Sequence, residues 1–334
     1  PEPGEPTPEP TPTPTPEPAE ELPTWNLRCP TVASAADVDT HIGRWVDDLY
    51  TMTGGRITVE VYSSYELLPD EQIMNALKAG TVDCSMYMCY VNPALTQTGW
   101  VEGNLPYGVD NPIEFEVLYR HRGLKEIFEQ DYADFGVKYV GRWQYDPVST
   151  MISTKPVESI EDFQGLKLSS FRPFGGVWED AGAQMVNVPP DELYLAGKTG
   201  TVDAVGWGGA HQYYVMGLQE AYPYYLANSC AGALVGCMIF NQDVWDSFGP
   251  EIQRMIEVAT DKASTEDSTF KYDGESWGRE PYIVTRLSPE DEDILRGYAW
   301  AYWDEQAQAN DMAAQVVQIY RDYNAELEEV QFHR

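Results

Sequence analysis

The sequence predicts an α/β fold in which two similar lobes enclose a ligand cleft, and three observations support this. The chain has 334 residues, 43% of them apolar, which is enough for two units with a core each. Segments in which apolar and polar residues alternate, as in strands, take turns along the chain with segments whose apolar residues have a helical period. This order is typical of parallel sheets covered by helices. One strand–helix unit also occurs twice, because KAGTVDCSMY at 78–87 returns as KTGTVDAVGW at 198–207.

The repeat continues upstream, where Pro69 and Glu71 correspond to Pro189 and Asp191 at the same offset. Chance similarity is the alternative, since glycine followed by a β-branched residue is common in such units. Matches at one constant offset favour duplication or convergent packing instead. Ligands of open α/β sheets bind outside the carboxyl ends of the strands. The two copies are therefore expected to form matching edges of one cleft.

Each copy is expected to lie in an alternating series of strands and helices. The first series begins with a strand, and its elements are expected at 25–33, 36–52, 57–62, 70–79 and 82–90. Glycines after the two helical stretches mark where those helices end. The second series also begins with a strand, and its elements are expected at 166–171, 175–182, 185–188, 191–199 and 202–207.

A long C-terminal helix is expected to follow the two series. Ser288 is a typical N-cap residue, Pro289 suits the first helical position, and the two acids after it suit the positive end of the helix dipole. The remaining chain has few helix breakers besides Gly297 and Asn310. Its aromatic residues are interpreted as core or helix–helix packing.

The beginning of the chain is unlike the rest. Residues 1–23 are rich in proline, threonine and glutamate, which predicts a disordered, extended spacer without a core. Such a spacer fits an exported protein tethered at its N-terminus, for example by a lipid anchor. After it we expect lobe I at 24–149, to which about 234–275 return, and lobe II at 150–233, with about 276–334 as spanning helices.

The formal net charge of −33 narrows the choice of partners. Such a surface repels nucleic acid and anionic membranes, so neither is an expected partner. It leaves the charge of a small ligand open, because one positive pocket can lie in an acidic surface. No run of about 20 apolar residues is present, so no membrane-spanning helix is expected.

The sequence contains no signature of catalysis or of a cofactor. Its four histidines and five cysteines make no HExxH or CxxC pattern, and the nucleophile elbow, the phosphate loop and the dinucleotide glycine motif are missing too. An enzyme, a metal site and a cofactor are therefore not expected. Two readings remain for the cysteines: disulfides within the pairs 84/89 and 230/237 if the protein is exported, or buried free thiols, with one thiol left over in either case.

Aromatic residues gather at the expected strand ends. Tyr90 follows the first copy of the repeat, and Trp207 and Tyr213 lie at the second. Phe171 is the last residue of the strand expected at 166–171. Packing in the core is the alternative for any one of them. As a set at strand ends, they predict the aromatic wall of a small-molecule pocket.

Over residues 25–334 the sequence resembles the solute-binding proteins of tripartite ATP-independent periplasmic (TRAP) transporters. The resemblance is carried by MTGGRITVEVYSSYELLPDEQIMNALKAGTVD, NLPYG, YADFGVKYVG, STKPVESIEDFQGLKL, DELYLAGKTGTVDAVGW and NQDVWDSFGPEIQRMIEVA. YADFGV, VDAVGW and AYPYYL look most like the branch that binds 2-oxo acids and similar organic acids. The resemblance implies a periplasmic-binding-protein-like fold, with crossing strands between two α/β lobes and a long C-terminal helix spanning both.

The resemblance also implies a function. A small organic acid would be captured by lobe closure, in the periplasm or at the extracellular face, and delivered to TRAP membrane subunits. A ligand-sensing domain that feeds a signalling partner is the alternative, and an enzyme on the same scaffold is a further one. A monomer is the default expectation, and a homodimer through the last helix is the other possibility.

The sequence departs from this family where the ligand would be held. After Gly-Leu-Lys-Leu the family usually has an arginine that clamps a carboxylate, and this chain has Ser169. The 2-oxo acid branch usually has Glu-Trp, whose glutamate helps to hold a cation, and this chain has Gly206 before Trp207. A glutamine of that branch aligns near Ser149.

Two interpretations of these departures are open. In one, Arg172 reaches into the cleft and supplies the missing guanidinium. In the other, small residues enlarge the pocket for a bulkier, aromatic or less charged ligand. We expect an enlarged pocket that still uses Arg172 and holds no metal ion. Gly206 and Gly208 would then let backbone and ligand approach closely beside Trp207, with a tight turn without ligand as the alternative.

Overall fold

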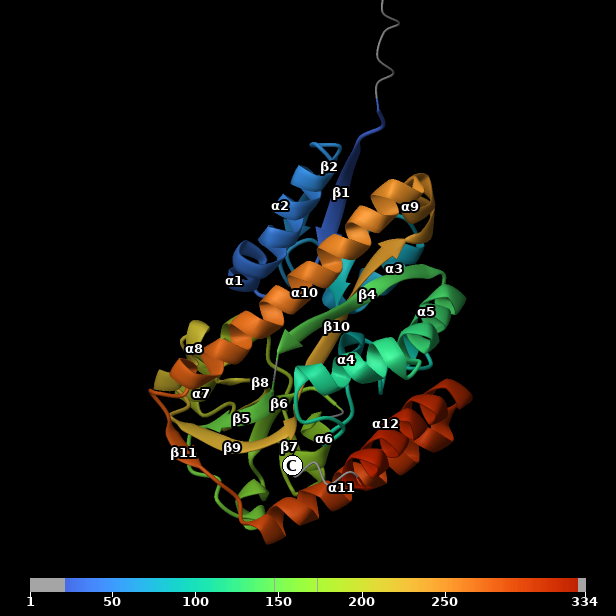
Figure 1. Ribbon diagram of the computed structural model, residues 1–334. Helices are drawn as coiled ribbons and strands as arrows, with labels where there is room; N and C mark the ends of the chain where they lie inside the picture. The colour runs from blue at the N-terminus through green and yellow to red at the C-terminus, as the bar shows by residue number, and fades with distance from the viewer. Residues whose placement is uncertain (1–21, 147, 173, 330–334) are drawn as a thin grey trace, which may run out of the picture.

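The structure is a computed structural model that describes residues 22–146, 148–172 and 174–329 (Figure 1). The predicted spacer at 1–23 lies outside this part of the chain except for its last two residues. The described chain forms two lobes, each built around β-strands with helices packed on them.

Lobe I contains two sheets. Strands β1 (Trp25–Pro30) and β2 (Ile57–Tyr62) pair in parallel. Strand β10 (Leu234–Asn241) lies between β3 (Cys84–Tyr87) and β4 (Val137–Asp146) and is antiparallel to both. Every residue of β10 is buried, as expected for a central strand that is covered on both faces.

Lobe II contains one mixed sheet with the strand order β11-β9-β5-β8-β6-β7. These strands are β5 (Ser149–Ser153), β6 (Lys167–Ser170), β7 (Gln184–Met185), β8 (Ala204–Gly208), β9 (Tyr224–Ala231) and β11 (Ile283–Thr285). Strand β6 is parallel to β7 and β8, whereas β5 is antiparallel to both of its neighbours. Most strands that were expected to be parallel are parallel, β1 with β2 and β6 with β7 and β8, whereas β3 pairs with β10. The antiparallel strands β5 and β10 each follow directly on a strand of the other lobe.

The helices follow the predicted order with some interruptions. They are α1 (Ala35–Asp37), α2 (Gly43–Met52), α3 (Ile73–Lys78), α4 (Pro112–His121), α5 (Leu124–Phe135), α6 (Phe174–Asp180), α7 (Leu193–Thr199), α8 (Ala210–Val215), α9 (Gln242–Ser247), α10 (Pro250–Gly278), α11 (Pro289–Ala309) and α12 (Asp311–Glu329). A π-helical turn, η1 (Val38–Ile42), interrupts the helix expected at 36–52. Asn310 divides the C-terminal helix, because its side-chain oxygen caps α12 by accepting from the N–H of Ala313.

The chain passes between the lobes several times. Strand β4 leads into β5, and β9 leads back into β10. Helix α10 packs on α2 and β4 in lobe I and on α8 in lobe II, and Figure 1 shows it running along both lobes. Helix α11 packs on α6 in lobe II, and α12 packs on α4 and α5 in lobe I. The residue limits proposed for the lobes from the sequence stay a prediction.

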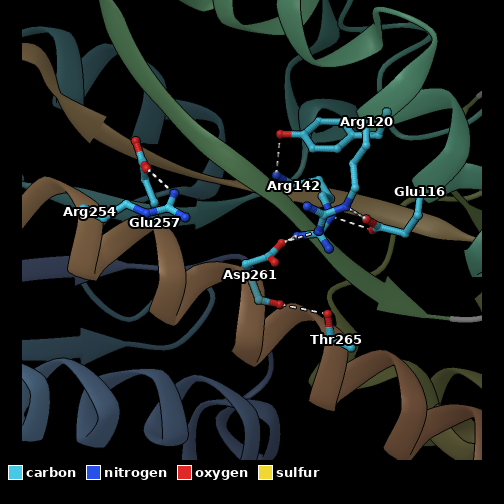
Figure 2. A network of polar contacts seen from close by, with 8 residues as sticks. Glu116, Arg120, Arg142, Arg254, Glu257, Asp261 and Thr265 are labelled. Carbon is cyan, nitrogen blue, oxygen red and sulfur yellow. Dashed lines mark hydrogen bonds and ion pairs between the residues drawn. The ribbon is translucent and has the colours of Figure 1, made fainter.

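Ion pairs fix α4 and α10 on either side of β4 (Figure 2). The almost fully buried guanidinium of Arg142, on β4, lies 2.5 Å from Glu116 Oε1 and 2.7 Å from Asp261 Oδ1. Arg120 pairs with the same two carboxylates. Since α10 also reaches lobe II, this network helps to hold the helix that both lobes share.

The repeated unit makes the same hydrogen bonds in both lobes. Asp83 Oδ2 accepts from the N–H of Arg28 at 2.7 Å, and the N–H of Asp83 donates to the carbonyl of Arg28 at 3.0 Å. Asp203 makes the same two bonds with Lys167, at 3.1 and 2.7 Å. The glycine of each Gly-Thr-Val-Asp has a φ of +70° or +73°, the left-handed conformation that favours glycine at a helix end. The aspartate of the motif therefore ties the chain between a helix and the next strand to a residue of another strand, Arg28 of β1 in lobe I and Lys167 of β6 in lobe II.

Buried apolar side chains form three clusters. One extends through both lobes and includes Trp45, Trp143 and Trp178, and the other two lie in lobe I beneath α12 and in lobe II. None of the helices in the described part of the chain combines the length and the apolar character needed to cross a bilayer.

Candidate functional site

A cavity of about 340 Å³ lies between the two lobes. Its wall follows the carboxyl ends of the strands, where α/β proteins bind their ligands. In lobe I these residues come after β1 (Val32, Ser34), after β2 (Ser64, Tyr65) and after β3 (Met88, Tyr90). In lobe II they come at and after the end of β6 (Ser169, Ser170, Phe171, Arg172) and after β7 (Asn187, Val188).

The two copies of the repeat face the cavity with their first residues. Asp70 and Glu71, at the start of the short helix η2 (Asp70–Gln72), line it from lobe I. Pro189 and Pro190, before and in η6 (Pro190–Glu192), line it from lobe II. The Thr-Val-Asp ends of the copies lie at the opposite ends of their strands, where they make the hydrogen bonds described above.

The acidic part of the lobe I wall is held in place by its neighbours. Asp70 is 5% exposed and accepts from Ser64 Oγ at 2.6 Å and from the N–H of Tyr65 at 2.9 Å. Burial raises the pKa of Asp70, and these two hydrogen bonds oppose the rise. The hydroxyl of Tyr65 donates to Glu71 Oε1 at 2.8 Å. The wall therefore presents carboxylates and hydroxyl lone pairs.

The basic residue of the lobe II wall is Arg172. Its Nη2 lies 2.8 Å from Glu179 Oε2, and its side chain is 51% exposed. The hydrogen bond that Arg172 donates to Glu179 raises the pKa of Arg172, so the guanidinium is charged but already paired. Ser170 Oγ, beside it in the wall, donates to the carbonyl of Gly206.

A buried polar layer lies behind the cavity. Ser34 Oγ and Gln212 Nε2, both in the wall, donate to Asp37 Oδ2 at 2.7 and 3.2 Å. Behind Asp37 lies the fully buried Lys271 of α10, whose Nζ is 3.7 Å from Asp37 Oδ1 and 3.4 Å from Asp267 Oδ1. Burial lowers the pKa of Lys271, but Asp267 and Asp37 outweigh it and the net shift is upward. This lysine is therefore charged and compensates the acids around it.

Asp146 is the exception in this layer. It is 0% exposed, and within the described part of the chain no group donates a hydrogen bond to either carboxyl oxygen. Burial raises the pKa of Asp146 well above its ordinary range, although Lys271 opposes the rise. We therefore expect this carboxyl group to be neutral.

These features suit reversible binding of a small polar molecule. In the described residues, no three side chains of His, Cys, Asp or Glu are placed together so that they could hold a metal ion. The cavity wall combines aromatic rings with a few polar groups that are fixed by their own hydrogen bonds, as is typical of small-molecule sites.

Comparison with known proteins identifies the family. The model of the bacterial extracellular solute-binding proteins, family 7, matches residues 32–272, which is more than half of the chain. The chain belongs to this family. Its lobed α/β fold with a cleft is therefore the fold of an extracellular solute-binding protein.

Individual solute-binding proteins resemble the chain over most of its length. A monocarboxylate 2-oxoacid-binding periplasmic protein of Nostoc sp. is 26% identical over 82% of this chain and 76% of its own. The structure of a TRAP periplasmic solute-binding protein from Chromohalobacter salexigens with bound (S)-(+)-2-amino-1-propanol is 27% identical and superposes with a TM-score of 0.88, covering 93% of this chain and 99% of that one. A TRAP protein from Colwellia psychrerythraea with bound calcium and pyruvate has the same fold, with 18% identity and a TM-score of 0.82 over 92% and 96% of the two chains.

The structure brings some of the predicted site residues of this family 7 protein together. Tyr90, Ser169, Phe171 and Arg172 line the cavity from the two lobes. Trp207 lies in β8, but its side chain is outside the described part of the structure. Contact of these residues with a ligand stays a prediction.

The other predicted residues lie away from the cavity wall. Ser149 is fully buried, and its carbonyl accepts from Ser229 Oγ at 3.0 Å. The hydroxyl of Tyr213 accepts from the N–H of Gly208 at 2.8 Å and donates to the carbonyl of Thr150 at 2.9 Å, so it joins β8 to β5. These groups contribute to the lobe II sheet next to the cavity.

Gly206 and Gly208 have packing roles in the structure. A Cβ atom at Gly206 would lie 2.4 Å from the indole ring of Trp178, and one at Gly208 would lie 3.2 Å from Asp146 Oδ2. Side chains of the protein itself therefore occupy the space that these glycines leave. Neither interpretation made from the sequence, a close approach of ligand or a tight turn, included this packing.

Sequence reasoning missed several residues of the wall. The polar ones are Ser34, Ser64, Asp70, Glu71 and Gln212, and the aromatic ones are Tyr65 and Trp100. The carboxyl-end rule could have found those that follow β1 and β2. Gln212 and Trp100 come from a helix and a loop, and no local pattern marks them. All five cysteines of the chain are buried free thiols, so the disulfide reading is wrong for this structure.

Proposed function

We propose that this chain captures a small organic solute between its lobes and delivers it to the membrane subunits of a TRAP transporter. The observation that carries the proposal is the cavity, because its wall comes from both lobes. A ligand that contacts both lobes stabilises the closed arrangement over the open one, and this difference in affinity drives closure. Family membership supports the same function.

The connections between the lobes suit such a movement. Leu234, at the start of β10, lines the cavity at the place where the chain crosses from β9. Few residues separate β4 from β5 and β9 from β10 at the two crossings between the lobes. Small changes of the backbone dihedrals of these residues would therefore turn one lobe against the other. Helix α10 packs on both lobes and limits the movement to directions that preserve its contacts.

We place the protein outside the cytoplasm, in the periplasm or at the extracellular face. The family is named for extracellular binding, which supports this location. A lipid anchor at the end of the Pro/Thr/Glu-rich segment would keep the protein near its membrane partners. We propose a monomer as the transport form and no catalytic activity.

The relatives allow more than one class of ligand. The Nostoc relative is named for 2-oxoacids, and the Colwellia structure contains pyruvate, so organic acids are one class. The Chromohalobacter structure contains an amino alcohol, which carries an ammonium group at neutral pH. An organic solute of either class, bulky enough to use a cavity of about 340 Å³, is consistent with the proposal.

Small-angle X-ray scattering combined with mass spectrometry tests this function. The purified protein is denatured to release any co-purified solute for identification, then refolded, and scattering is recorded with and without candidate solutes. We expect a bound solute to decrease the radius of gyration. A rigid particle whose scattering does not respond to any solute, and which releases none on unfolding, would contradict the proposal.

A further inference from the structure

We propose that the cavity binds a small organic ammonium compound, whose N–H groups donate to the lobe I wall and to Gln212. The ligand class concerns the same cavity and therefore rests on the proposed function. It differs from the carboxylate class that the sequence favours. Charge, hydrogen-bond direction, an unsatisfied buried acceptor and aromatic content each support it.

The charge of the cavity wall favours a cation. Among the described residues that line it, Asp70 and Glu71 are acids and Arg172 is the base. Arg172 is paired with Glu179 at 2.8 Å, which neutralises most of its effect on a ligand. A carboxylate would therefore meet a net negative wall, whereas an ammonium group would be attracted.

The direction of the hydrogen bonds agrees with the charge. The hydroxyl groups of Ser34, Ser64, Tyr65 and Ser170 each donate their proton to an acceptor of the protein. Because a hydroxyl group has one proton, these four residues can only accept from a ligand in this arrangement. A wall rich in acceptors suits a ligand with several N–H donors, and a primary ammonium group has three.

Gln212 adds a buried acceptor without a partner. Its side chain is 1% exposed and its Nε2 donates to Asp37 Oδ2, which leaves Oε1 as the remaining polar atom. No donor from the described residues reaches Oε1. Buried amide oxygens nearly always have a hydrogen-bond partner, and leaving one without a partner is unfavourable. A ligand N–H at this wall would satisfy it.

Aromatic rings complete the environment of a cation. Tyr65, Tyr90 and Trp100 line the cavity from lobe I, and Phe171 lines it from lobe II. The face of an aromatic ring attracts organic cations, which is why ammonium-binding sites are often lined by such rings. The polar groups of the lobe II wall, such as the hydroxyl of Ser169, suit a neutral oxygen at the other end of the ligand.

Isothermal titration calorimetry with matched probes tests the inference. Alanine and lactate differ by an ammonium group in place of a hydroxyl group, and so do 2-amino-1-propanol and 1,2-propanediol. Each amine is expected to bind about tenfold or more tightly than its partner, because hydrogen bonds between charged groups are the strong ones. Because the cavity exceeds the size of these compounds, the phenyl-substituted forms of both pairs are titrated as well. Equal or tighter binding of the hydroxy partner in each pair would overturn the inference.

A charge-removing variant adds a test within the protein. Glu71→Gln removes a charge from an exposed side chain of the wall and keeps its size. It is expected to weaken the binding of the amines about threefold or more and to leave the binding of the hydroxy compounds unchanged. Glu126→Gln, an exposed residue of α5 outside the wall, is the control and should change neither. The same loss of amine affinity in both variants would mean that only the overall charge matters, which contradicts a specific ammonium site.

Failure of the inference and failure of the proposed function give different results. If lactate or pyruvate binds and decreases the radius of gyration while the amines do neither, the ammonium class is wrong and solute capture stands. If no probe binds, no co-purified solute is found and the scattering never changes, both are wrong.

Discussion

Replacing Glu102 with Gln should make the protein less sensitive to alkaline pH. Glu102 is 2% exposed in the loop that carries Trp100 to the cavity, and it accepts a hydrogen bond from the hydroxyl of Tyr132 at 2.8 Å. Burial raises the pKa of Glu102 from its ordinary value of 4.5 to about 8, and the nearby Asp131 adds to the rise. The side chain is therefore neutral at pH 7 in the folded protein and ionised in the unfolded chain.

The sign of the effect follows from proton binding. Below pH 4.5 the carboxyl group is protonated in both the folded and the unfolded state, so its titration does not change the free energy of unfolding. Between pH 4.5 and about 8 the folded state binds more protons than the unfolded state, so this free energy falls as pH rises. The loss is complete above pH 8 and amounts to about 5 kcal/mol, from about 1.4 kcal/mol for each pH unit of the difference.

Urea denaturation followed by tryptophan fluorescence at pH 5, 7 and 9 measures this effect. Glu102→Gln imitates the neutral carboxyl group, so its stability relative to the wild type should rise by several kcal/mol between pH 5 and pH 9, with about 5 kcal/mol as the upper limit. Any constant cost of the new amide group is the same at each pH. Glu126→Gln, on the same helix as Tyr132 and exposed, is the control. Parallel pH profiles of wild type and Glu102→Gln would refute the reasoning.

Three further predictions concern packing, ion pairs and thiols. Gly206→Ala should destabilise the protein by about 1–3 kcal/mol because its Cβ would press against the ring of Trp178, whereas Gly297→Ala, inside α11 with open space around it, should not destabilise the protein in the same denaturation assay. Arg142→Ala should cost about 1–3 kcal/mol, since two partly exposed carboxylates lose the buried guanidinium between them and keep Arg120, and an unchanged urea midpoint would contradict this. In the native protein none of the five thiols should react with a thiol reagent, and in denaturant all five should react. Fast reaction of the native protein would disprove their burial.

Local patterns predicted the elements that depend on local physics. Strand β2 lies at 57–62, as its alternation indicates, and β1 begins at Trp25. Helix α11 begins after Ser288, whose Oγ accepts from the N–H of Asp291 at 3.1 Å. In these cases the residues that decide the structure are neighbours in the sequence.

The remaining features depend on contacts between distant parts of the chain. The antiparallel position of β10 between β3 and β4 cannot be inferred from its continuous apolar run, which fits any buried strand. No helix is predicted from the sequence where α10 lies, because its buried face includes Lys271, Asp267 and Glu275 as well as apolar residues. Their pairing with residues from other elements makes that burial possible.

The same distinction between local and distant contacts applies to the candidate site. The rule on strand ends led to Tyr90 and Phe171, since it needs only the order of elements, and the resemblance to the family's motif led to Ser169. It did not lead to Asp70 or Gln212, because the chain has 54 acidic residues and many polar ones, and only the fold shows which of them line the cavity.

The order of the strands has a consequence for how the molecule assembles. Strands β3 and β4 both pair with β10, which begins about 90 residues after β4 ends, once the chain has passed through lobe II. Until then both strands have open hydrogen-bonding edges that could pair with another chain. During synthesis the first lobe therefore stays incomplete while the second can already form, so a shortened chain ending before Leu234 should aggregate rather than yield an isolated lobe I.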